Sequence, residues 1–266
     1  MLIYIRGAGD LATGVAVRLI RSGYSVVLCD IAQPTAIRRT VAFSEAIRLG
    51  ETSVEGIRAC HAESPEAALS LCAQGIVPVL CDPQARFLPV LKPGAVVDAI
   101  LAKRNLGTHI AMAPVVVALG PGFTAGRDCH AVVETMRGHD LGRVYYESCA
   151  LPNTGIPGEI GGQSEKRVLR APADGFFSPL REIGEIVSPG EAVARVGEIP
   201  LRTQIGGVLR GLLPDGIYVT KGFKAGDIDP RCARAHCYTV SDKARALGGG
   251  VLEAILHFSG GVECTF

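Results

Sequence analysis

A glycine-rich turn between an apolar strand and an amphipathic helix opens the sequence and most constrains its fold. Residues 2–6 are an apolar run, the turn follows with Gly7, Gly9 and Ala12, and apolar residues then recur at helical spacing over 11–20. Gly7 permits the tight turn, Gly9 lets the backbone approach a pyrophosphate, and Ala12 lets the helix pack closely on the strand. The pattern predicts a strand–loop–helix unit whose helix N-terminus can hold a phosphate group.

An acidic residue ends the next predicted strand. Asp30 closes the strand 25–30 and lies 21 residues after Gly9, where a carboxylate would bond a ribose 2′-hydroxyl, so the pattern favours NAD over NADP. Asp10, in the first helical turn, would repel a phosphate, an effect that Arg6 and Thr13 could offset. Two interpretations therefore stay open: the loop binds a nucleotide or another phosphate-bearing ligand, or the fold is a Rossmann-like scaffold whose first turn binds no ligand.

The first half of the chain alternates strand and helix patterns. A helix is expected over 64–74, and continuous apolar runs indicate strands buried on both faces at 25–30, 76–81, 95–99 and 114–119. This order predicts an α/β fold in which residues 1–127 form a Rossmann-like, doubly wound parallel sheet that binds a nucleotide.

The second half, residues 128–266, reads as a β-rich domain with a C-terminal helical segment. A hairpin is expected across 137–142, and over 168–229 a pattern of strand, glycine turn and Val-x-x-Gly turn occurs twice. The repeat resembles the barrel-sandwich hybrid of biotinyl and lipoyl carrier domains, but 197–202 lacks the modifiable lysine, so a carrier role is not expected. Three glycines, Gly248–Gly250, interrupt the last helical segment, either because the backbone approaches something closely or because two helices meet there.

Composition excludes several classes of protein. The net charge of +1, 14 aromatic residues and absence of Trp favour neither a nucleic-acid-binding surface nor a stacking platform. Nine cysteines, an odd number without framework spacing, indicate a reducing compartment. No signal peptide is recognised, and the uncharged residues 105–126 contain prolines and glycines unlike a membrane span. A cytoplasmic protein without nucleic-acid or membrane partners is expected.

Further candidate residues follow the predicted strands. Arg38 and Arg39 could grip a phosphate or form a solvated surface loop. Asp98 and Lys103 could orient a ligand, although a structural salt bridge between them is favoured. The segments after three strands, 82–83, 98–105 and 120–126, are expected to converge at the carboxyl edge of the sheet.

Two groups of residues have side chains of the types that bind metal ions. Asp128, His130 and Glu134 share one face if they lie on a strand, but a hydrogen-bonded structural histidine is favoured. Cys232, His236 and Cys237 lack a second pair of ligands. No metal site is predicted.

Motifs spread over residues 2–257 resemble one family. They are the stretches Ile5–Gly14, Pro34–Thr40, Asp98–Lys103, Leu119–Phe123, Glu134–His139, Gly226–Arg231 and Ser241–Ala244. Together they are similar to the selenium-dependent molybdenum hydroxylase accessory family, of the YqeB type. The resemblance implies a Rossmann-like cytoplasmic protein that assists assembly of a molybdopterin centre, with a molybdenum hydroxylase or its maturation factors as partners. The remaining residues, 259–266, are expected to be a variable tail.

Two functional classes stay open. One is a maturation factor that binds a nucleotide or a molybdopterin-type ligand through Gly7, Gly9, Asp10, Ala12, Thr13, Asp30, Arg38, Arg39 and Lys103. The other is an NAD(P)-dependent oxidoreductase, for which Lys103, His109 and His130 are the plausible acid–base groups. Whether the chain is an enzyme, what its catalytic residues are and whether it forms a homo-oligomer are left open.

Overall fold

The computed structural model describes residues 1–260, so 261–266, which include Cys264 and most of the predicted variable tail, lie outside the described residues. The chain forms two compact units. The first comprises Met1–Pro34, Phe43–Thr154 and the chain from Val240 onward, and the second comprises Thr35–Ala42 and Gly155–Thr239. This division differs from the predicted boundary between residues 127 and 128, because later segments of the chain complete the sheet and cover one of its faces.

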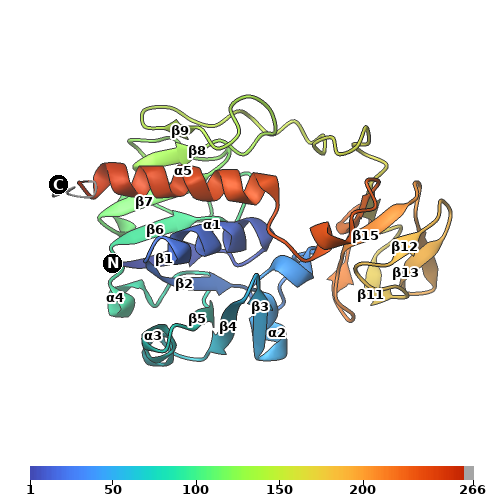
Figure 1. Cartoon of the computed structure of the whole chain (residues 1–266), viewed down its shortest axis with the longest axis horizontal. Coiled ribbons are helices and arrows are strands. Elements are labelled where there is room, and N and C mark those ends of the chain that lie inside the picture. Colours follow the sequence, from blue (N-terminus) through green and yellow to red (C-terminus); the bar gives the residue numbers. More distant parts are fainter. Residues whose placement is uncertain (261–266) are drawn as a thin grey trace. The chain divides into compact units, whose positions relative to one another are not determined.

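A nine-stranded, mostly parallel sheet forms the centre of the first unit (Figure 1). Its strands lie in the order β3 (Glu51–Val54), β4 (Ile57–Ala62), β5 (Val77–Cys81), β2 (Ser25–Asp30), β1 (Leu2–Arg6), β6 (Ala95–Asp98), β7 (Val115–Leu119), β8 (Ala131–Val133) and β9 (Val144–Tyr145). Neighbours are parallel except in the two edge pairs, β3–β4 and β8–β9. The predicted hairpin at 137–142 is the connection between β8 and β9.

The helices of this unit are α1 (Asp10–Arg21), α2 (Glu45–Leu49), α3 (Pro65–Ala73), α4 (Leu88–Leu91), the 3₁₀ turn η2 (Ile110–Met112) and α5 (Asp242–Phe258). The α3 helix confirms the prediction over 64–74, and Ser64 caps it by accepting the N–H of Ala67 at 3.1 Å. In residues 1–260 no helix is long and apolar enough to span a bilayer.

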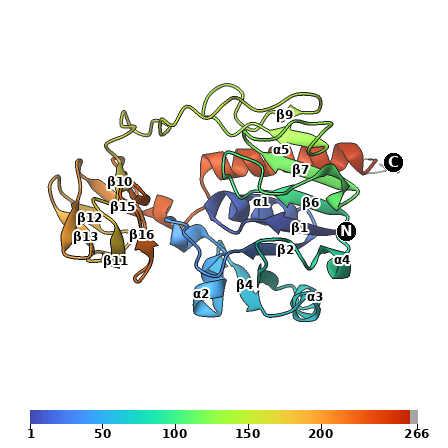
Figure 2. The same cartoon turned by 180° about the vertical axis from the view of Figure 1, so that it is seen from behind.

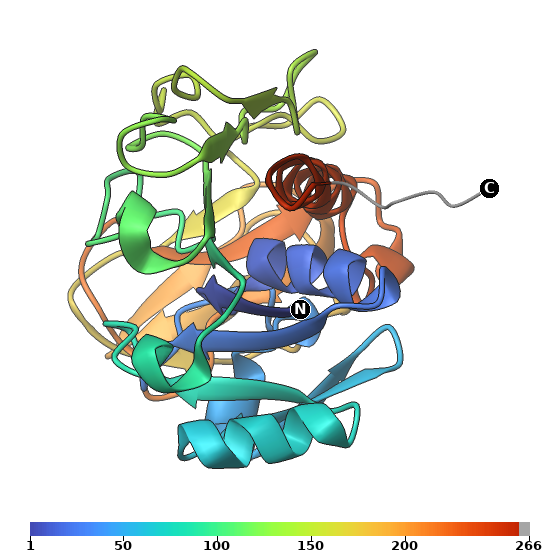
Figure 3. The ribbon, with the colours of Figure 1, turned by 90° about the vertical axis from the view of Figure 1, so that its left-hand side faces the viewer.

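Helices α1 and α5 lie side by side on one face of the sheet (Figure 3). A Cβ atom on Gly14 would lie 2.5 Å from Cβ of Ala244, and one on Gly248 would lie 2.8 Å from Cβ of Arg18. A Cβ on Gly250 would lie 2.5 Å from the carbonyl oxygen of Gly142. The α5 helix is continuous, so the glycine run serves a close backbone approach, and the alternative of two helices meeting there is wrong.

The opposite face carries a second apolar layer. Tyr4, Val27, Val96 and Val116, from the four central strands β1, β2, β6 and β7, belong to one cluster of buried side chains. The cluster also contains Ala68 of α3 and Leu91 of α4. Burial on both faces explains why these strands read as continuous apolar runs.

Neighbouring glycines of α5 provide a matched test of this helix contact. We expect Gly250→Ala to lower the free energy of unfolding by about 1–3 kcal/mol, because the added Cβ overlaps the Gly142 carbonyl. Gly249→Ala meets nothing within 4 Å and should raise it by about 0.5–1 kcal/mol through helix propensity. Urea unfolding of both variants measures the difference, and equal effects would contradict the close packing.

The second unit consists of two four-stranded antiparallel sheets, in the yellow-to-orange part of Figure 2. One sheet has the order β10 (Val168–Arg170), β17 (Lys224–Asp229), β15 (Gly207–Leu212), β12 (Ile186–Val187). The other has the order β14 (Ile199–Arg202), β13 (Ala192–Val196), β11 (Gly175–Pro179), β16 (Tyr218–Val219). Phe177, Val193 and Leu201 of one sheet share a core with Leu209 and Ile228 of the other. The short helices η1 (Arg39–Val41) and η3 (Arg234–Cys237) complete the unit.

The predicted internal repeat appears in the backbone hydrogen bonds. The N–H of Gly184 donates to the carbonyl of Leu209, and the N–H of Gly216 donates to that of Phe177. Likewise Gly190 donates to Thr203, and Gly222 donates to Ala171. Equivalent residues, 184 and 216 or 190 and 222, are 32 positions apart, so each half completes the other half's sheet.

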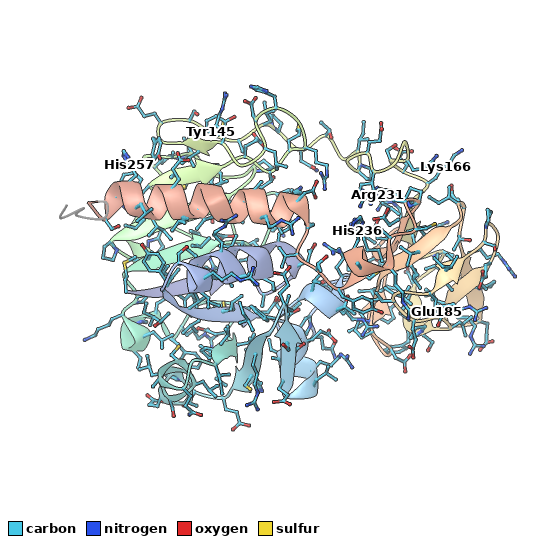
Figure 4. All side chains as sticks on the ribbon, in the orientation of Figure 1. Tyr145, Lys166, Glu185, Arg231, His236 and His257 are labelled. Atoms are coloured by element: carbon cyan, nitrogen blue, oxygen red, sulfur yellow. The ribbon has the colours of Figure 1, made fainter. Side chains whose placement is uncertain are left out.

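A chain of charges, buried except for the exposed Arg231, crosses the first of these sheets. Arg167 and Arg210 both pair with Asp227, and Arg210 also reaches Asp229 at 3.4 Å. Arg231 forms a two-pronged bond to Asp229, with Nε 2.9 Å from Oδ1 and a terminal nitrogen 2.6 Å from Oδ2. Figure 4 labels Arg231 together with His236, whose Nδ1 is 3.8 Å from Oδ2 of Asp229. Both carboxylates are almost fully buried and each has at least two cationic partners.

This network makes the stability of the protein depend on pH. Burial raises the pKa of Asp229, but the hydrogen bonds from Arg231 and the charges of Arg210 and Arg231 outweigh it and lower the pKa to about 2. The stability that Asp229 contributes is present above its ordinary pKa of 3.8 and is lost as the pH falls towards 2. We expect Asp229→Asn to lose about 3–5 kcal/mol at pH 7 and to show less acid destabilisation than the wild type between pH 4 and 2. Thermal unfolding at a series of pH values measures both effects.

Candidate functional site

The carboxyl edge of the large sheet brings together the glycine-rich loop and the segment after β6. Strand β1 lies between β2 and β6, so the chain winds outward in both directions from this point. A Cβ on Gly7 would lie 2.8 Å from the carbonyl oxygen of Ala99, and Gly7 has a φ of +99°, so only glycine fits. Open α/β sheets bind ligands at the carboxyl ends of strands where the winding direction reverses.

The glycine loop leads directly into the first helix. Gly9 is the N-cap of α1, with an ordinary φ of −67° and no side-chain cap, and Ala12 is a buried residue in the first turn of α1. Gly7 therefore meets the conformational requirement of the turn, whereas Gly9 occupies a backbone conformation open to any residue. Because glycine has no side chain, no capping group covers the N-terminus of α1 at Gly9.

Asp30 is fixed against this loop. Its Oδ2 accepts the N–H of Ala8 at 2.9 Å, and its Oδ1 accepts the N–H of Ile31 at 2.8 Å. Burial raises the pKa of Asp30, and these two hydrogen bonds oppose the rise. A carboxylate has about four lone-pair sites, so the two bonds leave capacity to accept a ligand hydroxyl.

Thr13 and Asp10 occupy different positions on α1. Thr13 is fully buried, and its Oγ1 accepts the N–H of Phe43 at 2.8 Å and donates to the carbonyl of Ala8 at 3.2 Å. Its hydroxyl thus joins the loop to the segment before α2. Asp10 is the first residue of α1, where its carboxylate complements the helix dipole.

A buried arginine lies immediately before the loop. Arg6 donates to Thr108 Oγ1, to the carbonyl of Leu106 at 3.0 Å and to that of Pro83 at 3.3 Å. It lies 3.6 Å from Asp98, which also accepts the Thr108 hydroxyl at 2.5 Å. Asp98 thus forms a buried salt bridge with Arg6, whereas Lys103 was the partner predicted from the sequence.

Burial raises the pKa of Asp98, against the lowering effects of its bonds to Thr108 and Ile100 and of the Arg6 charge. The carboxylate and the guanidinium neutralise each other beneath the glycine loop. Through its hydrogen bonds to Pro83, Leu106 and Thr108, this pair holds together the loops that follow β5 and β6.

The three segments expected to converge at this edge do meet. The Asp82–Pro83 segment reaches Arg6 through the Pro83 carbonyl. A Cβ on Gly122 would lie 2.7 Å from Cα of Arg104, which places the loop after β7 against the loop after β6. Lys103 lies in the loop after β6; it is exposed and has a φ of +63°.

Arg38 and Arg39 belong to the second unit. A terminal nitrogen of Arg38 donates to the carbonyls of His236 and Thr239 at 2.9 and 3.2 Å. Nε of Arg39 donates to the carbonyl of Leu212 at 2.8 Å. These bonds hold the segment Thr35–Ala42 to its own unit, a role that their position after β2 could not reveal.

The residues weighed as a metal site have separate partners. His130 Nδ1 accepts the N–H of Val116, and burial lowers its pKa. Glu134 is fully buried and accepts the N–H groups of Met136 and Leu151, while Asp128 accepts that of Thr124. The structural role favoured for His130 is confirmed. Since His130 precedes β8 at the amino edge of the sheet, it is unsuited as an acid–base group for the loops at the opposite edge.

In the described residues, 1–260, no three His, Cys, Asp or Glu side chains lie together as a metal site. Residues Gly248–Gly250 lie inside α5, where backbone N–H groups bond within the helix. These N–H groups are therefore not available to a ligand.

The class of protein is thus an α/β protein with a mixed, mostly parallel nine-stranded sheet and two small antiparallel sheets. No family model matches the chain. It is a close homologue of the "Uncharacterized protein YqeB" of Escherichia coli K12, with 53% identity over 255 residues, or 96% of this chain. The chain spans 47% of the length of that relative.

Solved structures are similar only at a low level. An aspartoacylase family protein from Mesorhizobium loti aligns with 85% of this chain and 83% of its own, at 12% identity and a TM-score of 0.29. A succinylglutamate desuccinylase/aspartoacylase from Rhodobacter sphaeroides aligns over 85% and 84%, at 16% identity and a TM-score of 0.28. TM-scores this low support no conclusion about fold or activity.

Cysteine reactivity tests the burial of the site. Cys29 lies beside Asp30, and burial raises its pKa to about 12, as it does for Cys129. Cys81, Cys149 and Cys232 are exposed. With iodoacetamide at pH 8, we expect the exposed three to be alkylated and Cys29 and Cys129 to be protected, because the thiolate is the reactive form.

Peptide mass spectrometry identifies the labelled residues. The same protein in urea is the control, in which Cys29 and Cys129 should react at the rate of the others. Rapid labelling of Cys29 in the folded protein would contradict the packing of β2.

Proposed function

We propose that this protein is an accessory factor in the maturation of selenium-dependent molybdenum hydroxylases and that it binds a nucleotide or a phosphorylated pterin at the carboxyl edge of its large sheet. The observation that carries the binding proposal is the glycine loop at the point where the sheet's winding reverses, with Asp30 bonded to its backbone. The pathway rests on the family resemblance of the sequence motifs, and the homology to YqeB supports membership of that family.

The residues at this edge suit a dinucleotide or a related phosphate ester. The N-terminus of α1 would hold the phosphate, with Gly9 as the closest backbone and no capping side chain in the way. Asp30 would accept a ribose hydroxyl and disfavour a 2′-phosphate, so NAD fits better than NADP. In this proposal the first unit is a Rossmann-like binding domain and the second a barrel-sandwich-like domain without a prosthetic group.

The alternative, an NAD(P)-dependent oxidoreductase, uses the same loop. It needs an acid–base group beside the ligand, and Lys103 and His109 lie on the segment after β6 at the correct edge. The two functions differ in the fate of the nucleotide. An oxidoreductase would oxidise or reduce it, whereas an accessory factor could keep it unchanged during maturation.

Titration calorimetry with NAD, NADP, ATP, CTP and GTP tests the binding proposal. We expect Gly9→Val to abolish binding with the fold intact, because the valine side chain would fill the phosphate position while its φ stays ordinary. The control Gly7→Val should instead destabilise the protein, because Gly7 has a positive φ and contacts Ala99. Failure of the wild type to bind any of these nucleotides would contradict the nucleotide assignment.

Deletion of the gene tests the pathway. The host's molybdenum hydroxylase should be synthesised but inactive, with a reduced content of molybdenum or selenium. Complementation with Gly9→Val should fail to restore activity. A fully active, fully loaded hydroxylase in the deletion strain would remove the maturation role and favour the oxidoreductase.

A further inference from the structure

Two large aromatic side chains of the second unit lie exposed and in contact with each other. Phe176 of β11 is 64% exposed and Tyr218 of β16 is 58% exposed (Figure 2). These two residues, the aromatic pair, are direct partners on adjacent antiparallel strands, so they share one face of the sheet. Their rings meet edge to face, with centroids 5.4 Å apart. Single exposed apolar side chains are ordinary on a protein surface, whereas contiguous ones mark an interaction site.

The internal repeat supplies a reference for this face. The residue 32 positions after Phe176 is Val208 of β15, and the residue 32 positions before Tyr218 is Ile186 of β12. Val208 and Ile186 are likewise direct partners on adjacent strands. Val208, however, is fully buried. The same position is therefore covered in one half of the repeat and open in the other.

Segments of the unit itself cover the face of β15. The N–H of Leu212 donates to the carbonyl of Ile37 at 2.8 Å, so the segment Thr35–Ala42 lies along this strand. Ile37 packs against the core cluster of the unit, and η3 also contacts β15. Within residues 1–260 no segment covers the aromatic pair in this way, since both rings remain exposed.

The charges of the two faces differ in the same manner. Arg195 of β13 is the strand partner of Ser178, which lies two residues after Phe176, so Arg195 shares the face of the aromatic pair. Its equivalent, 32 positions on, is Asp227, which is buried and paired with Arg210. Arg195 is instead exposed and forms no hydrogen bond or ion pair with any residue of 1–260.

An unpaired anion lies on the same hairpin. Glu198 is in the turn between β13 and β14, and it too is exposed and without an ion-pair partner in the described part of the chain. The N–H of Gly197 donates to the carbonyl of Phe176 at 3.0 Å, which fixes the level of the aromatic pair along the hairpin. Arg195 precedes this level and Glu198 follows it. The face thus combines an apolar centre with one unpaired charge of each sign.

We infer that this face is the interface of a homodimer, in which the aromatic pairs of two copies pack together and Arg195 of each copy pairs with Glu198 of the other. A two-fold axis that lies along the face, perpendicular to the strands at the level of Gly197, exchanges the two sides of that level. Each cation then meets the anion of the other copy, which is the self-complementarity that an isologous interface requires. The inference is independent of the nucleotide site proposed for the first unit.

The two kinds of contact have different roles in such an interface. Burial of the aromatic rings at its centre supplies most of the affinity, because large apolar anchors dominate the binding energy. The charges at its rim contribute less affinity and fix the orientation of the two copies, because like charges repel in every other arrangement. Truncation of the rings and reversal of the charges are therefore separate tests.

Sedimentation velocity over a range of protein concentrations measures the dimer. We expect the wild type to dimerise, and the double change Phe176→Thr and Tyr218→Thr to raise the dissociation constant at least about tenfold. Ile186→Thr is the matched control, because Ile186 is the repeat equivalent of Tyr218 and equally exposed, but lies on the other sheet. This control should leave the dissociation constant unchanged. Circular dichroism checks that all variants are folded.

Charge reversal tests the pairing of the two copies directly. Arg195→Glu and Glu198→Arg each bring like charges together, so each variant alone should shift towards monomer. Mixed in equal amounts, the two variants should form a heterodimer, because every pair in it again joins a glutamate to an arginine. A wild type that stays monomeric at all concentrations overturns the inference. A dimer that survives truncation of the aromatic pair, or a mixture of the two charge variants that stays monomeric, also overturns it.

Discussion

The buried ion pair between Arg6 and Asp98 is the interaction around which the first unit is organised. It joins the carboxyl ends of β1 and β6, the two neighbouring strands from which the sheet winds outward in opposite directions. Arg6 also bonds the loops after β5 and β6. A buried arginine without its carboxylate would cost several kcal/mol, so these loops and this pair stabilise each other. The glycine loop packs directly against the segment after β6, where Gly7 contacts Ala99.

The site above this pair combines rigid support with unused hydrogen-bonding capacity. Asp30 is oriented by two backbone N–H groups and Thr13 by two backbone partners, so the loop is shaped before any ligand arrives. Such preorganisation lowers the entropic cost of binding. Within residues 1–260, Arg6 Nε and Ser44 Oγ are among the buried polar atoms that make no hydrogen bond. This arrangement is the basis of the proposal that the edge binds a phosphate-bearing ligand.

The second unit is stabilised in a different way. Its two sheets exchange strands between repeats 32 residues apart, so neither half can complete a sheet alone. The Arg167–Asp227–Arg210–Asp229–Arg231 chain then links β17 to β15 and to the turn after β17. Its four buried members, Arg167, Asp227, Arg210 and Asp229, favour one strand register over its neighbours, because a shift would leave a buried charge without its partner.

Local sequence patterns determined the elements of this protein, and long-range contacts decided the site. The glycine turn, the apolar strands of the parallel sheet, helix α3 and the internal repeat follow from spacing and turn chemistry, which act over a few residues. The β3–β4 hairpin was not predicted, because Glu55 and Gly56 adopt positive φ in a turn without the usual Asn-Gly signal. The continuity of α5 through Gly248–Gly250 depends on its contact with α1, more than 200 residues away, and no local pattern reports such a contact. In the same way only the tertiary structure pairs Arg6 with Asp98, assigns Arg38 and Arg39 to the second unit and brings Ser44 to the glycine loop, because these interactions join segments distant in sequence.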